Sequence, residues 1–319
     1  MNVPLVSIVI PTYNYGRFVE QAIDSALAQT YEKVEVIVVD DGSTDDTSDR
    51  LQRFDGRIRV IHQKNQGLSA ARNTGIRAAT GALVALLDSD DAFHPRKIER
   101  QAWAFESRPN LALVGTGRFS DEPPTWSALG KEPLLSFPRL EELVVRTCFA
   151  PSSAMIRKEC FDEVGLFDTS LRSVEDRDMW IRIGARRPVA IVEEPLTWYR
   201  QTVGSMSRQA TTMEHYEAVV LDKAFALDGL KDRRLLKRKA KAQSALTAAY
   251  MFAEADDIST ALLRTLKSMW LWPVPLPRNE VNARFARPRL AFAMIRRLVQ
   301  RSLRLGQFPG NSRAKATQP

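Results

Sequence analysis

The stretch GALVALLDSDDAFHP, residues 81–95, carries the most information about the fold of this protein. Residues 82–87 are apolar without alternation, which is the pattern of a short strand buried on both faces. Asp88, Asp90 and Asp91 follow directly, and burying such charges without partners costs several kcal/mol. Two interpretations stay open: a divalent cation lies among the carboxylates, or the acids form a solvated turn in which Asp91 caps the next helix.

Strands and helices alternate on the N-terminal side of this stretch. Apolar β-branched runs predict buried strands, and apolar residues at positions 18, 19, 22, 23, 26 and 27 have the spacing of an amphipathic helix. The resulting expectation is strands at 6–10, 34–39, 58–62 and 82–87, separated by helices at 15–30, 44–54 and 67–80. This βαβ repetition predicts an α/β fold with a doubly wound, mostly parallel sheet and helices on both faces.

Polar clusters follow three of the predicted strands. They read PTYN at 11–14, DDGSTD at 40–45 and DSDD at 88–91. Ligands of such sheets bind beyond the carboxyl ends of the strands, so the three clusters are expected to meet in one crevice. The sequence lacks the glycine-rich patterns GxGxxG and GxxxxGKS/T, which argues against a dinucleotide oxidoreductase and a P-loop enzyme. An Asp-rich crevice instead suits a nucleotide whose phosphates are held through a metal ion.

Three ordered segments carry a resemblance to a known family. They are VSIVIPTYNYGRFVEQAIDSALAQTYEKVEVIVVDDGSTDDT, NQGLSAARNTGIRAATGALVALLDSDDAFHP and GLFDTSLRSVEDRDMWIRI. Together they resemble the inverting family-2 glycosyltransferases of the GT-A fold, over about residues 5–205. The resemblance implies a nucleotide-sugar donor, a divalent metal, Mn²⁺ or Mg²⁺, and a single-displacement reaction.

The resemblance also implies roles for individual residues. Donor contacts fall on Pro11, Tyr13, Asp41, Arg72 and Asp88, and the metal falls on Asp90. The residues alone leave simpler roles open, because Asp41 could cap a helix, Tyr13 could be a packed aromatic, and Arg72 could be a solvated cation. Convergence of the three strand-end clusters favours the donor roles over these alternatives.

The segment SVEDRDMW, residues 173–180, supplies the candidate base. Attack on an anomeric carbon requires a carboxylate that takes the proton of the acceptor hydroxyl, and the resemblance gives this role to Asp176. The residues alone favour a capping box between Ser173 and Asp176. Glu175 is expected to support the base or bind the acceptor. Trp126, in a Pro-rich and Ser-rich insertion, is either an acceptor contact or an anchor.

The second protein ligand of the metal stays open. Many members of the family carry a histidine in the loop that corresponds to residues 199–207, where this chain has Gln201 and Thr202 but no histidine. His94 lies just beyond the acidic cluster, and we expect it to help begin a helix rather than to bind metal.

Charge is distributed unevenly along the 319 residues. Residues 1–200 carry 25 Lys/Arg and 29 Asp/Glu, whereas residues 201–319 carry 21 and 9. This shift predicts a catalytic domain at 1–205, with a nucleotide-sugar half at about 1–95 and an acceptor half at 96–205. A basic helical region with a disordered tail is expected at 206–319.

The C-terminal region predicts a membrane contact. Helices are expected at 209–229, 231–254 and 256–270. A basic amphipathic helix is expected at 289–305, with three arginines opposite an apolar face: Arg297, Arg301 and Arg304 opposite Met294, Ile295, Leu298 and Leu305. Such a helix either lies on an anionic membrane surface or docks on the protein. The start of the chain has no basic, cleavable leader pattern, and no apolar run suffices to span a bilayer, so a cytoplasmic location is expected, with peripheral attachment at the inner face of the membrane left open.

The expected function is therefore metal-dependent, inverting and non-processive transfer of one sugar. The acceptor would be a hydroxyl of a glycan or of a lipid-linked molecule, in surface polysaccharide or glycoconjugate synthesis. Two alternatives stay open: a membrane-surface or nucleic-acid binding module with an inactive transferase domain, and a nucleotidyltransferase. Nucleic acid is not an expected partner, because the basic segments lack interleaved aromatic residues.

Overall fold

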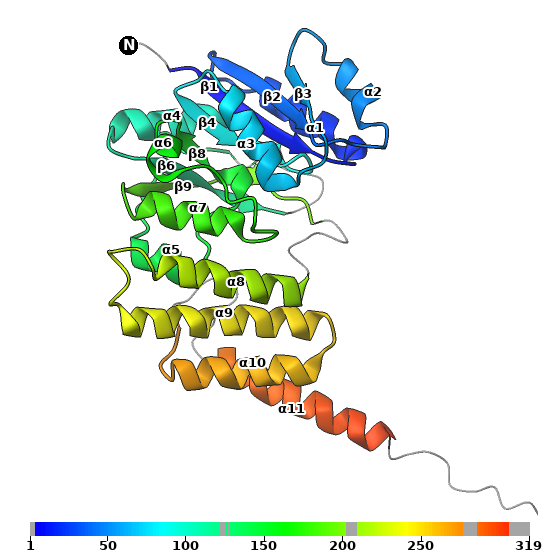
Figure 1. Ribbon diagram of the computed structural model, residues 1–319, viewed down its shortest axis with the longest axis vertical. Coiled ribbons are helices and arrows are strands. Elements are labelled where there is room, and N and C mark those ends of the chain that lie inside the picture. The colour runs from blue at the N-terminus through cyan, green and yellow to red at the C-terminus, as the bar shows by residue number, and fades with distance from the viewer. Residues whose placement is uncertain (1–3, 121–125, 127, 202–208, 277–285, 306–319) are drawn as a thin grey trace, which may run out of the picture.

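The computed structural model describes residues 4–120, 126, 128–201, 209–276 and 286–305. Within these residues the strands form a nine-stranded sheet in the order β3-β2-β1-β4-β8-β6-β9-β5, with β7 paired to β9 (Figure 1). The strands are β1 Val6–Thr12, β2 Val34–Asp40, β3 Arg59–His62, β4 Leu83–Leu86, β5 Ala92–Phe93, β6 Leu113–Phe119, β7 Leu135–Ser136, β8 Met155–Arg157 and β9 Val189–Trp198. The helices are α1 Gly16–Leu27, α2 Thr47–Gln52, α3 Leu68–Ala78, α4 Lys97–Ser107, α5 Leu140–Val145, α6 Cys160–Val164, α7 Glu175–Gly184, α8 Ala210–Ala224, α9 Arg234–Glu254, α10 Ile258–Leu271 and α11 Ala286–Leu305, with a short 3-10 helix η1 at Pro151–Ser153.

The sheet has a parallel part and a mixed part. Strands β3, β2, β1 and β4 pair in parallel, so the carboxyl ends of β1, β2 and β4 lie at one edge. Strand β8 then pairs antiparallel with both β4 and β6, and β9 runs parallel to β6. The predicted α/β sheet is confirmed, and the second half of the sheet adds the antiparallel strands.

Both faces of the sheet are covered by helices, which explains the uninterrupted apolar runs. In β1, Ile8 and Ile10 belong to a buried cluster with Ile23 of α1, whereas Val9 belongs to a second cluster with Ile76 of α3. Successive side chains of a strand point to opposite faces, so each run supplies both clusters.

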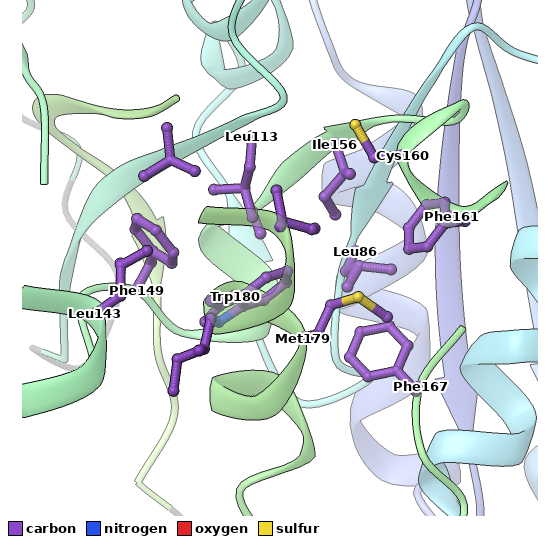
Figure 2. Close-up of a cluster of buried hydrophobic side chains, with 14 of the residues drawn as sticks. Leu86, Leu113, Leu143, Phe149, Ile156, Cys160, Phe161, Phe167, Met179 and Trp180 are labelled. Atoms are coloured by element: carbon purple, nitrogen blue, oxygen red, sulfur yellow. The ribbon is translucent and has the colours of Figure 1, made fainter. Parts of the chain in front are cut away.

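The second cluster anchors α7. Figure 2 shows Met179 and Trp180 of α7 among buried side chains from the sheet and the surrounding loops. The Trp180 ring meets Phe149 and Phe167 edge to face, with centroids 5.8 and 6.2 Å apart. Met179 and Ile183 are also buried in the core. Because these side chains are fixed by packing, the start of α7 is held in place against the sheet.

The predicted strands all form, but several predicted helices are shorter than expected, and the second helix differs most in proportion. A helix was predicted over residues 44–54, whereas α2 spans Thr47–Gln52. The Asp45 carboxylate accepts hydrogen bonds from the Thr47 amide at 3.0 Å and from the Gly16 amide at 3.2 Å. These contacts hold residues 44–46 in a turn, which delays the helix.

The C-terminal helices stack beneath α5 and α7 (Figure 1). Helix α8 packs on α7, α9 on α5 and α8, α10 on α9, and α11 on α10. Val220 and Leu221 of α8 belong to the same buried cluster as Trp180. The predicted boundary near residue 205 falls in 202–208, outside the described residues, so the division into domains stays a prediction. Among the helices described, none is both long and apolar enough to cross a membrane.

Candidate active site

The loops after β1 and β2 are joined by hydrogen bonds at the edge of the sheet. The Asn14 amide donates to Ser43 Oγ at 2.9 Å, and the Thr44 amide donates to Asn14 Oδ1 at 2.7 Å. The Asp41 amide donates to the Thr12 carbonyl at 2.9 Å. The first two polar clusters therefore form one wall of the site.

The predicted donor residues on this wall differ in their surroundings. Pro11 is buried within β1, while the Tyr13 side chain is 44% exposed just beyond it. The Asp41 carboxylate is buried and accepts from the Gln63 side chain at 2.7 Å and from the Gly67 amide at 2.8 Å. Asp41 thus holds the loop before α3, and it does not cap α2, whose N-cap is Asp46.

The acidic loop after β4 is fixed by residues from distant parts of the chain. Ser152 Oγ accepts from the Asp88 amide at 3.0 Å and donates to Asp91 Oδ2 at 2.5 Å. The other oxygen of Asp91 accepts from the Arg200 amide at 3.0 Å. The interpretation of Asp91 as a helix cap is therefore wrong: α4 begins at Lys97 with Arg96 as its N-cap, and Asp91 instead ties the acidic loop to β9.

The three acids of this loop are close enough to repel one another. Burial raises the pKa of Asp91 well above its ordinary value, and the negative charges of Asp88 and Asp90 raise it further. Among the described residues, no three His, Cys, Asp or Glu side chains are grouped to hold a metal ion by themselves. A partly exposed Asp90 in this negative field fits Mg²⁺ or Mn²⁺ that takes its remaining ligands from substrate phosphates and water.

Arg72 links the two halves of the site. This guanidinium on α3 is 1% exposed and donates to Asp88 Oδ1 at 2.6 Å and to Glu175 Oε1 at 2.5 Å. Asp88 follows β4 and Glu175 begins α7, so one buried cation joins the strand-end loop after β4 to the start of α7. Arg72 is thus not a solvated cation.

Asp176 lies in the first turn of α7. Residue Val174 before the helix has φ of 55°, a left-handed conformation that is strained for a β-branched side chain. The predicted capping box is wrong, because Ser173 Oγ contacts Met213 and Asp176 Oδ1 accepts from the neighbouring Arg177 amide at 2.7 Å. The carboxylate of Asp176 is therefore not used to satisfy the amide of Ser173.

The protonation of Asp176 is set by its environment. Burial raises the pKa of Asp176 to about 7, and the negative charge of Glu175 adds to the rise. The Arg177 amide and the Arg72 guanidinium act in the opposite direction. A carboxyl with a pKa near neutrality can accept a proton from a hydroxyl and release it again, which is the property of a general base.

A buried ion pair supports Asp176 from the C-terminal region. The guanidinium of Arg177 pairs with Glu217 of α8 and donates to the Val144 carbonyl at 2.6 Å. Both charged side chains are buried. The residue next to the candidate base is therefore held jointly by α5 and α8.

We expect Glu217→Ala to lower the free energy of unfolding by about 3 kcal/mol, because it leaves the buried Arg177 charge without its partner. Asp222→Ala on the same helix is the matched control, since its carboxylate is mostly exposed and should matter little. Urea unfolding of both variants measures the difference. Equal stability of the two variants would contradict the structural role of Glu217.

Trp126 lies apart from the contacts among Arg72, Asp88 and Glu175. Its ring meets His94 and Phe119 edge to face, each with centroids 5.1 Å apart. His94 Nδ1 accepts from the Arg96 amide at 3.0 Å, at the start of α4. These contacts agree with an anchoring role for Trp126 and with the expected helix-start role of His94.

Sequence reasoning gave no role to three residues that hold the site together: Ser152, Arg200 and Glu217. Besides its bond to Asp91, Arg200 donates from Nε to the Asp90 carbonyl at 3.1 Å and from its other end to Gln21 at 2.5 Å. The expectation about Thr202 falls within residues 202–208, outside the described residues. For Arg200 the sequence did hold a signal, because an arginine just after a buried strand is unusual.

Comparisons with known proteins point to one family. A family model described as Glycosyl transferase family 2 matches residues 7–165. An uncharacterised glycosyltransferase of Rickettsia typhi is 32% identical over 231 residues, covering 68% of this chain and 70% of that protein. The protein EpsJ of Bacillus subtilis, also described as an uncharacterised glycosyltransferase, is 34% identical over 64% of this chain and 63% of its own length. Other relatives are longer: the chain spans 33% of one from Rickettsia felis and 58% of one from Rickettsia prowazekii.

Solved structures share the fold. S. aureus TarS in complex with UDP superposes with a TM-score of 0.54 at 17% identity, covering 88% of this chain and 98% of that one. The mannosyltransferase PcManGT from Pyrobaculum calidifontis, in complex with GDP-Man and Mn²⁺, gives 0.53 at 18% identity, covering 93% and 88%. These likenesses confirm the GT-A type of sheet followed by helices.

Proposed function

The chain belongs to glycosyltransferase family 2, and we propose on this basis that it transfers one sugar from a nucleotide-sugar donor to a hydroxyl, with inversion at the anomeric carbon. The observation that carries the proposal is the raised pKa of Asp176, about 7, beside the Arg72 bridge between the two halves of the site. In the proposed reaction Asp176 takes the proton of the acceptor hydroxyl while that oxygen attacks the sugar. The sugar's bond to the diphosphate breaks, and the nucleoside diphosphate leaves.

The donor is proposed to lie over the edge formed by β1, β2 and β4. Pro11 and Tyr13 would contact the base, Asp41 would accept from a ring N–H, and Asp88 would contact the ribose, with its carboxylate oriented by Arg72. Structural neighbours in complex with UDP, UDP-GlcNAc and GDP-Man support a nucleotide-sugar as the class of donor.

A divalent metal on Asp90 is part of the proposal. When bound, Mn²⁺ or Mg²⁺ would neutralise charge on the departing diphosphate as a Lewis acid. Within this chain, Asp90 would hold the ion, while Ser152 and Arg200 fix the loop that carries it. The Mn²⁺ in the PcManGT structure supports a metal of this class.

The acceptor is proposed to be a glycan or a lipid-linked molecule in surface polysaccharide or glycoconjugate synthesis, used at the cytoplasmic side of a membrane. Glu175 would support the base or bind this acceptor, because it lies between Arg72 and Asp176. Transfer would be non-processive, with one sugar added in each encounter.

Release of nucleoside diphosphate from a panel of sugar nucleotides tests the proposed function. The protein should release nucleoside diphosphate with Mn²⁺ from one or a few donors, faster with a suitable acceptor, and the anomeric coupling in the product NMR spectrum should show inversion. Absence of release and of binding for all donors would instead support a binding module. Release of pyrophosphate from a nucleoside triphosphate would support a nucleotidyltransferase.

We expect Asp90→Ala to remove the effect of Mn²⁺ on donor binding. Loss of a metal ligand should weaken metal-assisted donor affinity by more than the roughly 10- to 100-fold that loss of an outer partner costs. Calorimetric titration of the donor with and without Mn²⁺ measures this. Asp228→Asn, an almost fully exposed acid far along the chain, is the matched control. An unchanged Mn²⁺ effect in Asp90→Ala would assign the metal to another residue.

A further inference from the structure

The helix pair α10 and α11 exposes large apolar side chains. On α10 they recur at 263, 266 and 270, and on α11 at 292, 295 and 299, so each set follows the i, i+3, i+7 spacing of one helix face. Trp270 is 77% exposed and Phe292 is 71% exposed. We call these residues the α10/α11 ridge: Leu263, Leu266, Trp270, Phe292, Ile295 and Val299.

Each helix of this pair turns its apolar face away from the helix on which it packs. Arg287, near the start of α11, donates to the carbonyls of Ser268 and Trp272 at the end of α10, and Thr265 Oγ1 donates to Met294 Sδ at 3.7 Å, so the helices run antiparallel. Ser268 Oγ donates to the Ala242 carbonyl at 2.7 Å, which marks the side of α10 that faces α9. With 3.6 residues per turn, the apolar face of α10 then points away from α9, and the apolar face of α11 lies on the side away from Met294, which packs on α10.

This arrangement corrects the apolar face that the sequence predicted for α11. Met294, Ile295, Leu298 and Leu305 were expected together opposite the arginines, on the membrane-facing side, and of these Ile295 is exposed. Met294 is 2% exposed and packs with Ile258 and Ala261 of α10, and Leu298 packs against the same cluster. The alternative of docking on the protein thus describes these two residues, whereas Phe292, Ile295 and Val299 face outward. The side chains of Arg301 and Arg304 lie outside the described residues.

Charge around the ridge is of one sign. Neither α10 nor α11 contains an Asp or Glu. Exposed cations flank the ridge at Lys267, Arg289 and Arg296. The ridge thus combines exposed apolar side chains with cations, and neither helix carries an acid. This combination complements a surface that is negative outside and apolar beneath.

We propose that the α10/α11 ridge docks on an anionic lipid bilayer, with its apolar side chains among the acyl chains and its cations at the headgroups. This inference rests on the proposed function in one respect only: docking would bring the active site to a lipid-linked acceptor. The stack of α8, α9 and α10 between the sheet and α11 then holds the active site above the membrane surface (Figure 1).

Co-sedimentation with vesicles tests the proposal without donor or acceptor. The full chain should bind phosphatidylcholine vesicles that contain one third phosphatidylglycerol, and it should bind pure phosphatidylcholine weakly. Arg289→Glu with Arg296→Glu should weaken binding by at least about fivefold for each cation removed, and raised salt should have a similar effect. Arg234→Glu with Arg238→Glu on α9 changes the net charge equally and should have a much smaller effect.

Trp270→Ala with Phe292→Ala tests the apolar part of the ridge. This pair should weaken binding about tenfold or more, while Leu235→Ala, an exposed leucine on α9, should not. Equal binding by all variants would overturn the proposal. So would a dimer that these ridge variants dissociate, because the ridge would then be an interface between two copies. Release of nucleoside diphosphate from the donor, during transfer to a water-soluble acceptor, is measured separately for the variants, so loss of vesicle binding and loss of transferase activity are distinguished.

Discussion

Asp176→Asn is expected to reduce sugar transfer by about 10²- to 10⁴-fold, because the amide cannot take a proton from the acceptor hydroxyl. The change keeps the size of the side chain and can still accept the hydrogen bond from the Arg177 amide. Donor affinity should therefore remain near that of the unchanged protein. Steady-state rates and calorimetric donor titration measure the two quantities separately.

The pH profile distinguishes a base from a structural carboxylate. The pKa of Asp176 is about 7, so the group is protonated below that pH and cannot act as base. Transfer should fall about tenfold per pH unit below neutrality. Glu175→Gln should move this fall to lower pH, because the negative charge of Glu175 raises the pKa of Asp176. A near-normal rate in Asp176→Asn, or an unmoved profile in Glu175→Gln, would remove Asp176 from the role. Asp228→Asn is the control for charge alone.

The strand ends were predictable from sequence because each depends on local pattern. An uninterrupted apolar run indicates a strand buried on both faces, and the parallel order of the strands brings their ends to one edge. The sequence could therefore place Asp41 and Asp88 as candidates, whereas Asp176, at the start of a helix, came only from the family resemblance. Their individual partners were not predictable, because Arg72 meets Glu175 across 103 positions and Arg200 meets Asp91 across 109.

Local spacing was misleading where distant contacts compete with it. Ser173 and Asp176 have the spacing of a capping box, but Val174 turns the chain into a left-handed conformation and Ser173 contacts Met213 of α8. Asp91 likewise precedes a helix by a few residues, but its carboxylate instead accepts hydrogen bonds from the Ser152 hydroxyl and the Arg200 amide. In both cases a long-range hydrogen bond replaced the local one that the sequence suggested.

The Arg72 bridge predicts the largest loss of stability. Arg72→Met should lower the free energy of unfolding by about 5 kcal/mol, because it leaves Glu175 buried and Asp88 half-buried without their shared cation. Asp88 and Glu175 hold the pKa of Arg72 above its ordinary value, so the arginine stays charged in the folded protein. The two acids would repel each other across the join between β4 and α7.

Two controls separate this effect from a general loss of charge. Arg77→Met removes an exposed arginine from the same helix and should change stability little. Arg72→Lys keeps the charge, but an ammonium group lacks the fork that reaches both carboxylates, so an intermediate loss is expected. Urea unfolding at neutral pH measures all three variants. If Arg72→Met were as stable as Arg77→Met, the bridge would not hold the two halves together. The burial that raises the pKa of Asp176 would then have to come from contacts of α7 other than this bridge.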